Sequence, residues 1–543
     1  MALIRKFGLT EETQHGKVAA LPPDVASAVQ KNLERMHDRP IYDFLMQYYM
    51  SEVNWMYQLV YPSYFLLQYQ RWWAAGTPSS VADVEFAVLL VRMCSYASQF
   101  LPSPSHMLDT VRGVSLADIR NTCNVIGDNL AAICRSLDTR GSLPRVQHIA
   151  FAGLISQVEG KTNDFWEKLN CAIRVAQRIG IDRSPGPWTE GGEQELQNEM
   201  QRRTFCNLYV WDSSLSRQLD RVPFLPDRLA IENLPRRHLG SDIDGTDVPE
   251  SFTERLLQVR LATFWRRFVP RVGIEYNLTV AEERYESFRS EFLDTLPSAF
   301  ALTPNEEWDD RLPMISLQRR LLHIQIFDSI CWNFRHVLFI KPQQALSLPP
   351  YKRVLLSSQK KALAAAALHV LDAVSSLHSM LGASHTRFDG IIFPTFEAAV
   401  LLVCLCMDLD FSGNGGGDAG SHASTADPLG DAATVTRDRC LDAAGKALDR
   451  LQMLAEVSKM AEAGARTLDR FLGRATREPV VAPAAIEWSD IQLPWSEGSL
   501  IPWSSFEEDI SPPGELFSAT ASEDSYFNHE LLPMDSGFPL VSA

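Results

Sequence analysis

The sequence predicts an all-α protein, in which one large multi-helix domain is followed by a disordered acidic tail at the C-terminus. Apolar residues recur at three- and four-residue steps through most of the chain, which is the period of an α-helix. No series of segments shows the apolar–polar alternation of β-strands, and no repeat of fixed length is present. Residues 479–543 contain eleven Asp or Glu and no Lys or Arg, a composition that resists folding into a core.

The chain is long enough for a large core, and its charge limits what it can bind. It has 543 residues, 45% of them hydrophobic, and a formal net charge of -16. Binding to a phosphate backbone depends on Lys and Arg side chains that neutralise phosphates. The acidic total therefore argues against direct DNA binding by this chain, although a local basic patch could override it.

The nine cysteines do not predict a disulfide framework, because their number is odd and their spacing is scattered. Only Cys404 and Cys406 approach the spacing of zinc ligands. They lie in the apolar run Ala398–Met407, so we expect buried helix cysteines and no metal site or other cofactor. This run is far shorter than the roughly 20 residues that span a bilayer. The N-terminus has no signal peptide, so we expect an intracellular protein with no membrane partner.

The expected organisation is a polar linker over residues 1–40 and a helical domain over 41–475. A glycine-rich, low-complexity loop over 412–432 interrupts the domain. Helical patterns follow one another at 41–53, 62–73, 83–101, 115–138, 144–159, 164–179, 195–219, 250–295, 314–340, 351–382, 393–409 and 437–474.

The clearest predicted helix runs from Asp164 to Ile179. Asp164 is placed to cap its N-terminus, and Glu167 three residues later gives the spacing of a capping box. Gly180 suits the left-handed residue that ends a helix.

The next helix carries a carboxylate in the middle of its apolar face. Thr204, Phe205, Leu208, Leu215 and Leu219 share one side of the helical wheel, and Asp212 lies among them. A buried carboxylate needs an ion-pair or hydrogen-bond partner. Arg203 is nearly opposite on the same helix, so we expect a partner from another element. Candidates are Arg174, Arg178, Arg183 and Arg221; the alternative is a partly exposed Asp212.

The same segment resembles the signature of the fungal-specific transcription factor domain, the middle homology region of zinc-cluster regulators. The matching positions combine an acid, paired arginines, aromatics, a second acid and a Leu-Pro end: Glu199, Arg202, Arg203, Phe205, Tyr209, Asp212, Ser216, Arg221, Asp227, Ile231 and Pro235. Weaker matches extend the resemblance over roughly residues 40–475. The family's Gly-Arg-Pro turn reads Asp220-Arg221-Val222 here, and an Asp can take the left-handed conformation that such a turn requires.

The resemblance implies a nuclear transcription regulator, acting on a specific pathway or metabolite gene cluster. Family members begin with six cysteines that bind two zinc ions, whereas the first cysteine here is Cys94, inside the helical pattern. We therefore expect DNA contact through a partner, or through a head missing from this chain. Zinc is expected only with such a head. The resemblance also implies homodimers or heterodimers and, for some members, a small-molecule effector.

The acidic tail interleaves aromatic residues with its carboxylates, among them Trp488, Trp495, Trp503 and Phe506. This alternation is typical of activation segments that bind coactivators or the transcription machinery. Two alternatives stay open: an acidic tail without a partner, and tryptophan segments that pack back on the helical body. No nucleophile-elbow, zinc-protease, dinucleotide-binding or P-loop motif is present, so we do not expect an enzyme. A helical scaffold without transcriptional output is the competing function.

Overall fold

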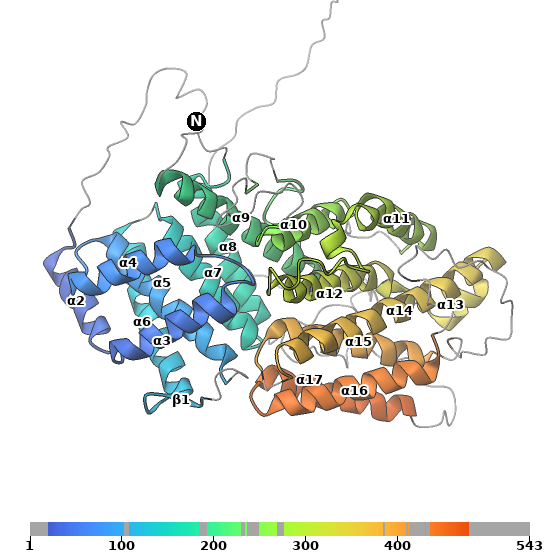
Figure 1. Ribbon diagram of the computed structural model, residues 1–543. Helices are drawn as coiled ribbons and strands as arrows, with labels where there is room; N and C mark the ends of the chain where they lie inside the picture. The colour runs from blue at the N-terminus through green and yellow to red at the C-terminus, as the bar shows by residue number, and fades with distance from the viewer. Residues whose placement is uncertain are drawn as a thin grey trace, which may run out of the picture.

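Helices are the dominant secondary structure in the part of the chain that the computed structural model describes, which confirms the all-α class (Figure 1). The described residues are 20–102, 108–138, 140–183, 193–229, 234–235, 249–268, 276–383, 386–408, 411, 429 and 435–476. The only strands among them are β1 (Thr110–Val111) and β2 (Val114–Ser115), which pair antiparallel. The predicted acidic tail, and the predicted glycine-rich loop apart from Leu429, lie outside the described residues.

The helices divide into two groups joined by α9 and α10 (Figure 1). The first group contains α2 (Pro23–Leu33), α3 (Arg39–Tyr48), α4 (Pro62–Ala75), α5 (Val81–Ala97), α6 (Leu116–Leu137), α7 (Leu143–Val158) and α8 (Thr162–Ile179). The junction is made by α9 (Glu193–Gln218) and α10 (Thr253–Arg266). The second group contains α11 (Leu278–Glu291), α12 (Ile315–Phe334), α13 (Pro342–Ser347), α14 (Pro350–Met380), α15 (Asp389–Met407), α16 (Arg437–Ala455) and α17 (Lys459–Thr476).

One continuous apolar core runs through both groups. In the first group α5 is buried along almost its whole length between α6 and α7. In the second group α14 and α15 are long and apolar enough to cross a membrane, and 67% of each apolar window is buried inside the fold. Their position in the core accounts for their hydropathy. Cys404 and Cys406 lie on α15 and are buried, as predicted.

Several predicted boundaries move because packing sets them more than local sequence signals do. Helix α8 starts at the buried Thr162, so the predicted capping box at Asp164 is wrong. Gly180 ends α8 with a φ of 84°, as predicted. The single helix predicted over 437–474 is two helices, α16 and α17. Within the predicted linker 1–40, residues Pro23–Leu33 form α2, which packs against α6, so the helical body includes part of that segment.

The contact between α7 and α8 depends on a residue without a side chain. A Cβ atom on Gly153 would lie 2.4 Å from Cδ2 of the Phe165 ring, which is too close for any real contact. Gly445 on α16 also lies in a helix, and a Cβ there would meet nothing within 4 Å.

We therefore expect Gly153→Ala to lower the free energy of unfolding by about 1–3 kcal/mol, because the overpacked core must shift. Gly445→Ala is the matched control, and should raise the free energy of unfolding by up to about 1 kcal/mol through helix propensity alone. Urea denaturation followed by circular dichroism measures both. Equal effects of the two substitutions would contradict the close packing of α7 on α8.

Candidate functional site

Helix α9 carries most of the predicted signature residues and buries them. It packs against α7 and α8 on one side and α10 on the other. All seven signature positions on this helix are buried: Glu199, Arg202, Arg203, Phe205, Tyr209, Asp212 and Ser216. Four of the seven carry a formal charge, so their burial requires compensating partners.

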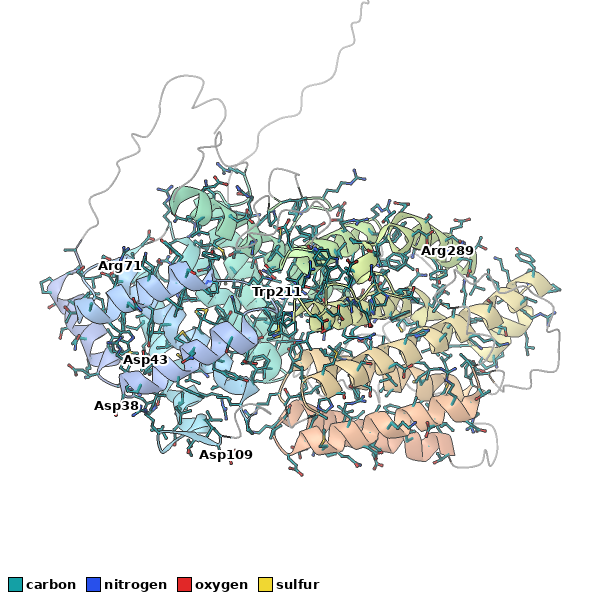
Figure 2. The ribbon with its side chains drawn as sticks, viewed as in Figure 1. Asp38, Asp43, Arg71, Asp109, Trp211 and Arg289 are labelled. Carbon is teal, nitrogen blue, oxygen red and sulfur yellow. The ribbon has the colours of Figure 1, made fainter. Side chains whose placement is uncertain are left out.

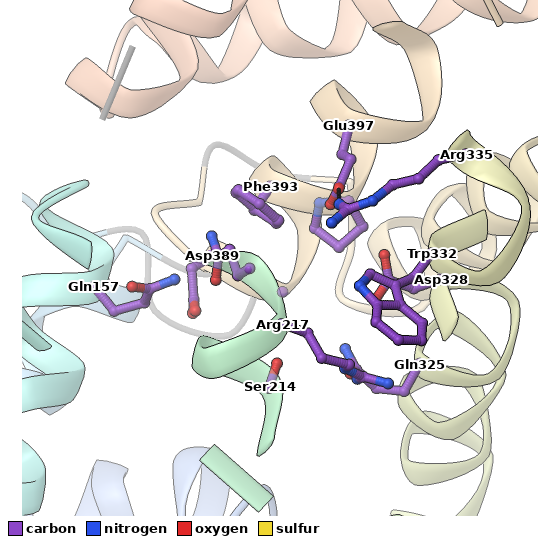
Figure 3. A pocket seen from close by; sticks show the side chains of 13 residues that line it. Gln157, Ser214, Arg217, Gln325, Asp328, Trp332, Arg335, Asp389, Phe393 and Glu397 are labelled. Carbon is purple, nitrogen blue, oxygen red and sulfur yellow. Dashed lines mark ion pairs between the residues drawn. The ribbon is translucent and has the colours of Figure 1, made fainter. Parts of the chain in front are cut away.

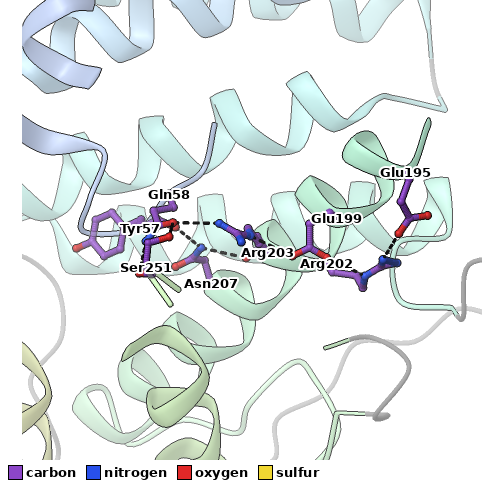
Figure 4. Close-up of polar contacts among 8 residues, drawn as sticks. All are labelled: Tyr57, Gln58, Glu195, Glu199, Arg202, Arg203, Asn207 and Ser251. Atoms are coloured by element: carbon purple, nitrogen blue, oxygen red, sulfur yellow. Dashed lines mark hydrogen bonds and ion pairs between the residues drawn. The ribbon is translucent and has the colours of Figure 1, made fainter. Parts of the chain in front are cut away.

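Glu199 pairs with both arginines of the same helix (Figure 4). Its Oε1 accepts from Nε of Arg203 at 3.1 Å, and its Oε2 accepts from Nε of Arg202 at 3.3 Å. Arg202 also reaches back to Oε1 of Glu195 at 2.8 Å. Both arginines make these ion pairs in the interior, with side chains 5% and 4% exposed.

The same network connects α9 to two segments that are distant in the sequence, one around Gln58 and one around Ser251 (Figure 4). Nη1 of Arg203 donates to Oε1 of Gln58 at 3.0 Å. That oxygen also accepts from the hydroxyl of Ser251 at 3.0 Å. Gln58 takes a left-handed φ of 47° in the turn that precedes α4. Nδ2 of Asn207 donates to the carbonyl of Tyr57 at 2.8 Å. Gln58 and Ser251 are 193 residues apart, and sequence reasoning did not identify either of them.

Asp212 is fully buried and paired, as predicted. Its side chain is 0% exposed, and Oδ2 lies 2.7 Å from Nη2 of Arg266 on α10. Its carboxylate also accepts from the backbone N–H groups of Phe224 and Leu225 at 3.0 and 2.9 Å. None of the four arginines proposed from the sequence is the partner, because the fold supplies one from 54 residues downstream.

The remaining signature residues hold the segment that follows α9. Asp220 adopts a φ of 51°, so the left-handed turn survives with Asp in place of Gly. Arg221, predicted as a partner of Asp212, donates instead to Oδ1 of Asn163 at 3.0 Å. The hydroxyl of Tyr209 donates to the carbonyl of Asp227 at 2.7 Å. Pro235 is described but joins none of these bonds, and Ile231 lies outside the described residues.

A small polar cavity lies where α9 meets α12 and α15, close to the end of α7 (Figure 3). Its volume is about 110 Å³. Charged side chains from α9, α12, α15 and the 3₁₀ helix Arg335–Phe339 line it, together with Trp332 and Phe393: Arg217, Asp328, Arg335, Asp389 and Glu397. Of these charged residues only Arg335 stood out in the sequence, as the start of a segment, Arg335 to Pro342, that resembles a family element.

Burial weakens the charges around this cavity. It raises the pKa of the Asp389 carboxyl from 3.8 to about 6. Burial also raises the pKa of Asp328 and of Glu397, and the proximity of these two carboxyls adds to the rise for Glu397. Burial lowers the pKa of Arg217.

The cavity keeps hydrogen-bonding capacity that the protein does not use. Glu397 pairs with Arg335 at 3.7 Å, and the guanidinium of Arg217 lies over the Trp332 ring with its carbon 6.0 Å from the centroid. Nη1 of Arg217 is buried without a hydrogen-bond partner among the described residues, and Arg217 and Asp328 attract each other electrostatically at the cavity. A donor and an acceptor therefore face the same space from α9 and α12.

Comparison with known proteins assigns the chain to a family. The model of the fungal specific transcription factor domain matches residues 46–242. Transcription factor xilB of Penicillium rubens is 46% identical over 503 residues, which are 88% of this chain and 74% of that protein. "Probable transcription factor sol4" of Alternaria solani is 39% identical over 454 residues, 82% of this chain and 81% of its own length. The chain belongs to the fungal-specific transcription factor family. It is a fungal transcription regulator.

The matched range ends seven residues after Pro235, so it includes every signature residue on and after α9. In this regulator the signature residues form buried ion pairs and hydrogen bonds. Eight of the nine cysteines are buried and the ninth, Cys171, is exposed. Among the described residues, no group of three or more His, Cys, Asp or Glu side chains is placed to hold a metal ion.

The buried pair between α9 and α10 gives a direct test of the signature. We expect Asp212→Ala to lower the free energy of unfolding by about 3–5 kcal/mol, because Arg266 is left charged and unpaired in the interior. Urea denaturation measures the loss. Asp310→Ala, at an exposed site, is the control and should change stability little.

A double variant separates pairing from packing. Asp212→Leu combined with Arg266→Met removes both charges, and should recover part of the lost stability. Recovery is incomplete because the amides of Phe224 and Leu225 lose their acceptor. A single Asp212→Ala variant with the unfolding midpoint of the unaltered protein would contradict the role of the pair.

The raised pKa of Asp389 predicts a pH-dependent stability difference. Between pH 3.8 and 6 the unfolded chain releases this proton and the folded chain keeps it, so stability falls as pH rises through that window. Above pH 6 the penalty is constant. Asp389→Asn should therefore match the unaltered protein near pH 4 and be more stable above pH 6. The gain is about 1–2 kcal/mol, because Asp389 is only partly buried and solvent screens part of the penalty. Asp310→Asn should show no such pH window.

Proposed function

We propose that this regulator activates the genes of one pathway or metabolite cluster from the nucleus. The observation that carries the proposal is residues 479–543, where eleven carboxylates and no cations are interleaved with eight aromatic residues. Mutual repulsion keeps such a segment extended, and leaves its aromatic side chains available to a groove on a coactivator or on the transcription machinery.

DNA contact is made by a partner or by a zinc-cluster head encoded upstream of Met1. A chain with a formal charge of -16 is a poor match to phosphates, and the buried cysteines are already committed to the core. The partner can be a second copy or a different regulator. We propose no catalytic activity, since the sequence contains no motif of converging catalytic groups.

The helical domain serves as a rigid platform in this proposal. Buried ion pairs and hydrogen bonds on α9 join it to the turn before α4, to α10 and to the loop that follows α9. Such networks are costly to break one partner at a time, so they favour a single arrangement of the two helix groups. A regulatory signal that enters one group is transmitted to the other by rigid contact.

We place the small-molecule effector of this proposal in the polar cavity. Arg217 can donate to a carboxylate or carbonyl of a ligand, and Asp328 can accept from its hydroxyl or amino group. A panel of small hydroxy and amino acids should contain a compound that raises the melting temperature of the chain. Arg217→Ala should abolish that rise, whereas Arg71→Ala, at an exposed site, should keep it. A compound that stabilises both variants equally would place the site elsewhere.

The tail can be tested apart from the rest of the chain. Fused to a heterologous DNA-binding domain, residues 479–543 should activate a reporter gene. Replacing Trp488, Trp495, Trp503 and Phe506 with Ala should reduce reporter output at least about tenfold, because aromatic anchors supply most of the energy of such interfaces. The matched control replaces the adjacent Ser489, Ser496, Ser504 and Ser505 with Ala and keeps every acid.

The competing function is a helical scaffold without transcriptional output. It shares the fold and the buried network, so only the tail discriminates. A silent reporter, together with unchanged transcripts in a deletion strain, would favour the scaffold. If the reporter is still activated after all four aromatic residues are replaced, the acidic charge of the tail alone would account for activation.

A further inference from the structure

Three large apolar side chains are exposed at one end of the molecule. Leu346 on α13 is 72% exposed, and Tyr351 and Val354 on the first turns of α14 are 64% and 71% exposed. Tyr351 and Val354 are three residues apart, so they share one face of α14. We call these three residues the α13–α14 patch. It lies at the yellow end of the molecule in Figure 1, on the far side from the blue helices α2 and α4.

The patch lies in a stretch of the chain that is rich in cations. Residues 329–371 contain no Asp or Glu, in a chain whose formal charge is -16. Lys341, Arg353 and Lys361 are exposed, and Lys352 is half-buried. Among the described residues, none of these four makes an ion pair. Carboxylates of other elements reach α14 only further along it, where Glu282 bonds Gln359 and Asp408 pairs with Lys360 in the printed contacts of the described residues. An exposed apolar surface beside unpaired cations is suited to a segment that is both acidic and aromatic.

The described fold ends close to this patch. Nη2 of Arg437 donates to the carbonyl of Ala475 at 2.7 Å, and its Nε donates to the carbonyl of Cys406 at 3.2 Å. Two residues after Cys406, Asp408 pairs with Lys360 of α14. The end of α17 and the first half of α14 therefore lie at the same end of the helix bundle.

The following chain is long enough to reach the patch. Lys360 is six residues beyond Val354, a separation of about 9 Å along a helix. Trp488 follows the end of α17 at Thr476 by twelve residues, which span up to about 40 Å when extended.

We propose that the α13–α14 patch is a docking surface for the acidic aromatic tail of the same chain, residues 479–543. The tail supplies carboxylates for the four unpaired cations, and aromatic rings for Leu346, Tyr351 and Val354. Attachment at Thr476 gives it an effective concentration in the millimolar range, so it outcompetes a free acidic peptide of similar affinity. A second copy is a poorer occupant, because two cationic patches repel each other.

Docking uses the same aromatic residues that the proposed function assigns to a coactivator. Competition between the patch and the coactivator therefore rests on the proposed function, whereas the docking contact does not depend on it. The tail therefore has two competing sites for the same side chains, one within the chain and one on its partner.

Photo-cross-linking in the full chain tests the contact. A photoreactive p-benzoylphenylalanine in place of Tyr351 should cross-link to residues 479–543 within one chain, at a yield independent of protein concentration. The same group in place of Leu67, exposed on α4 at the opposite end, is the positional control. Mass spectrometry of the digested product locates the cross-link. Equal tail cross-linking from both positions would overturn the proposal.

Charge reversal tests the chemistry of the contact. Lys352→Glu, Arg353→Glu and Lys361→Glu together should lower the cross-link yield roughly tenfold, because reversal removes three attractions and adds three repulsions. Lys31→Glu, Arg71→Glu and Arg174→Glu form the matched control at exposed cations of the first group, and should leave the yield unchanged. Leu346→Ser with Val354→Ser keeps every charge and should also lower the yield.

Each other result excludes the tail as occupant. Cross-links between chains that increase with concentration would assign the patch to a dimer interface. Nucleic acid that co-purifies with the chain and is lost on charge reversal, without tail cross-links, would assign it to phosphate binding. The reporter assay is independent: a tail that docks but fails to activate overturns the proposed function alone, and a tail that activates without docking overturns this inference alone.

Discussion

The ion pair between Asp212 and Arg266 is the interaction on which the arrangement of this fold depends. It joins the two helices at the junction of the groups, and it does so with 0% exposure of the carboxylate. A buried charge has few acceptable arrangements, because each alternative leaves an unpaired group in a medium of low dielectric constant. Apolar packing tolerates small shifts of one helix on another, whereas this pair fixes α10 on α9.

The other signature residues extend that constraint to loops. Arg266 also donates to the carbonyl of Leu225 at 2.7 Å, while Asp212 accepts from the amide of the same residue. The segment after α9 is therefore held by its backbone, which leaves its side chains free to vary. Gln58 and Ser251 are held by side-chain bonds instead, since Oε1 of Gln58 accepts from both Arg203 and the hydroxyl of Ser251. In this chain the buried signature residues on α9 bond to one another and to neighbouring segments of the fold.

The sequence was sufficient for the helical class and for the burial of Asp212, since both follow from a periodic pattern along a single segment. The sequence was insufficient to predict which residue pairs with each buried charge. Arg266 was visible as one of a pair of arginines, yet nothing in its neighbourhood indicates α9, because the contact arises only when α10 packs. Predicted helix boundaries were wrong for a related reason. An Asp such as Asp164 can cap a helix, but α8 already begins at Thr162, which is buried in the fold. The cavity could not be predicted because its charged residues come from separate helices that meet only in the folded protein.

The distribution of charge in this regulator shows why an acidic chain keeps a cationic surface. Most buried arginines, including Arg202, Arg203 and Arg266, are neutralised by carboxylates of the fold. The cations around the α13–α14 patch have no such partner among the described residues, although an acidic protein offers many carboxylates that could have been placed beside them. Unpaired cations beside exposed Tyr351 and Val354 give no stability to the helical body. Their arrangement is explained by a counterpart outside that body, and the chain itself carries one with the matching charge and the matching aromatic content.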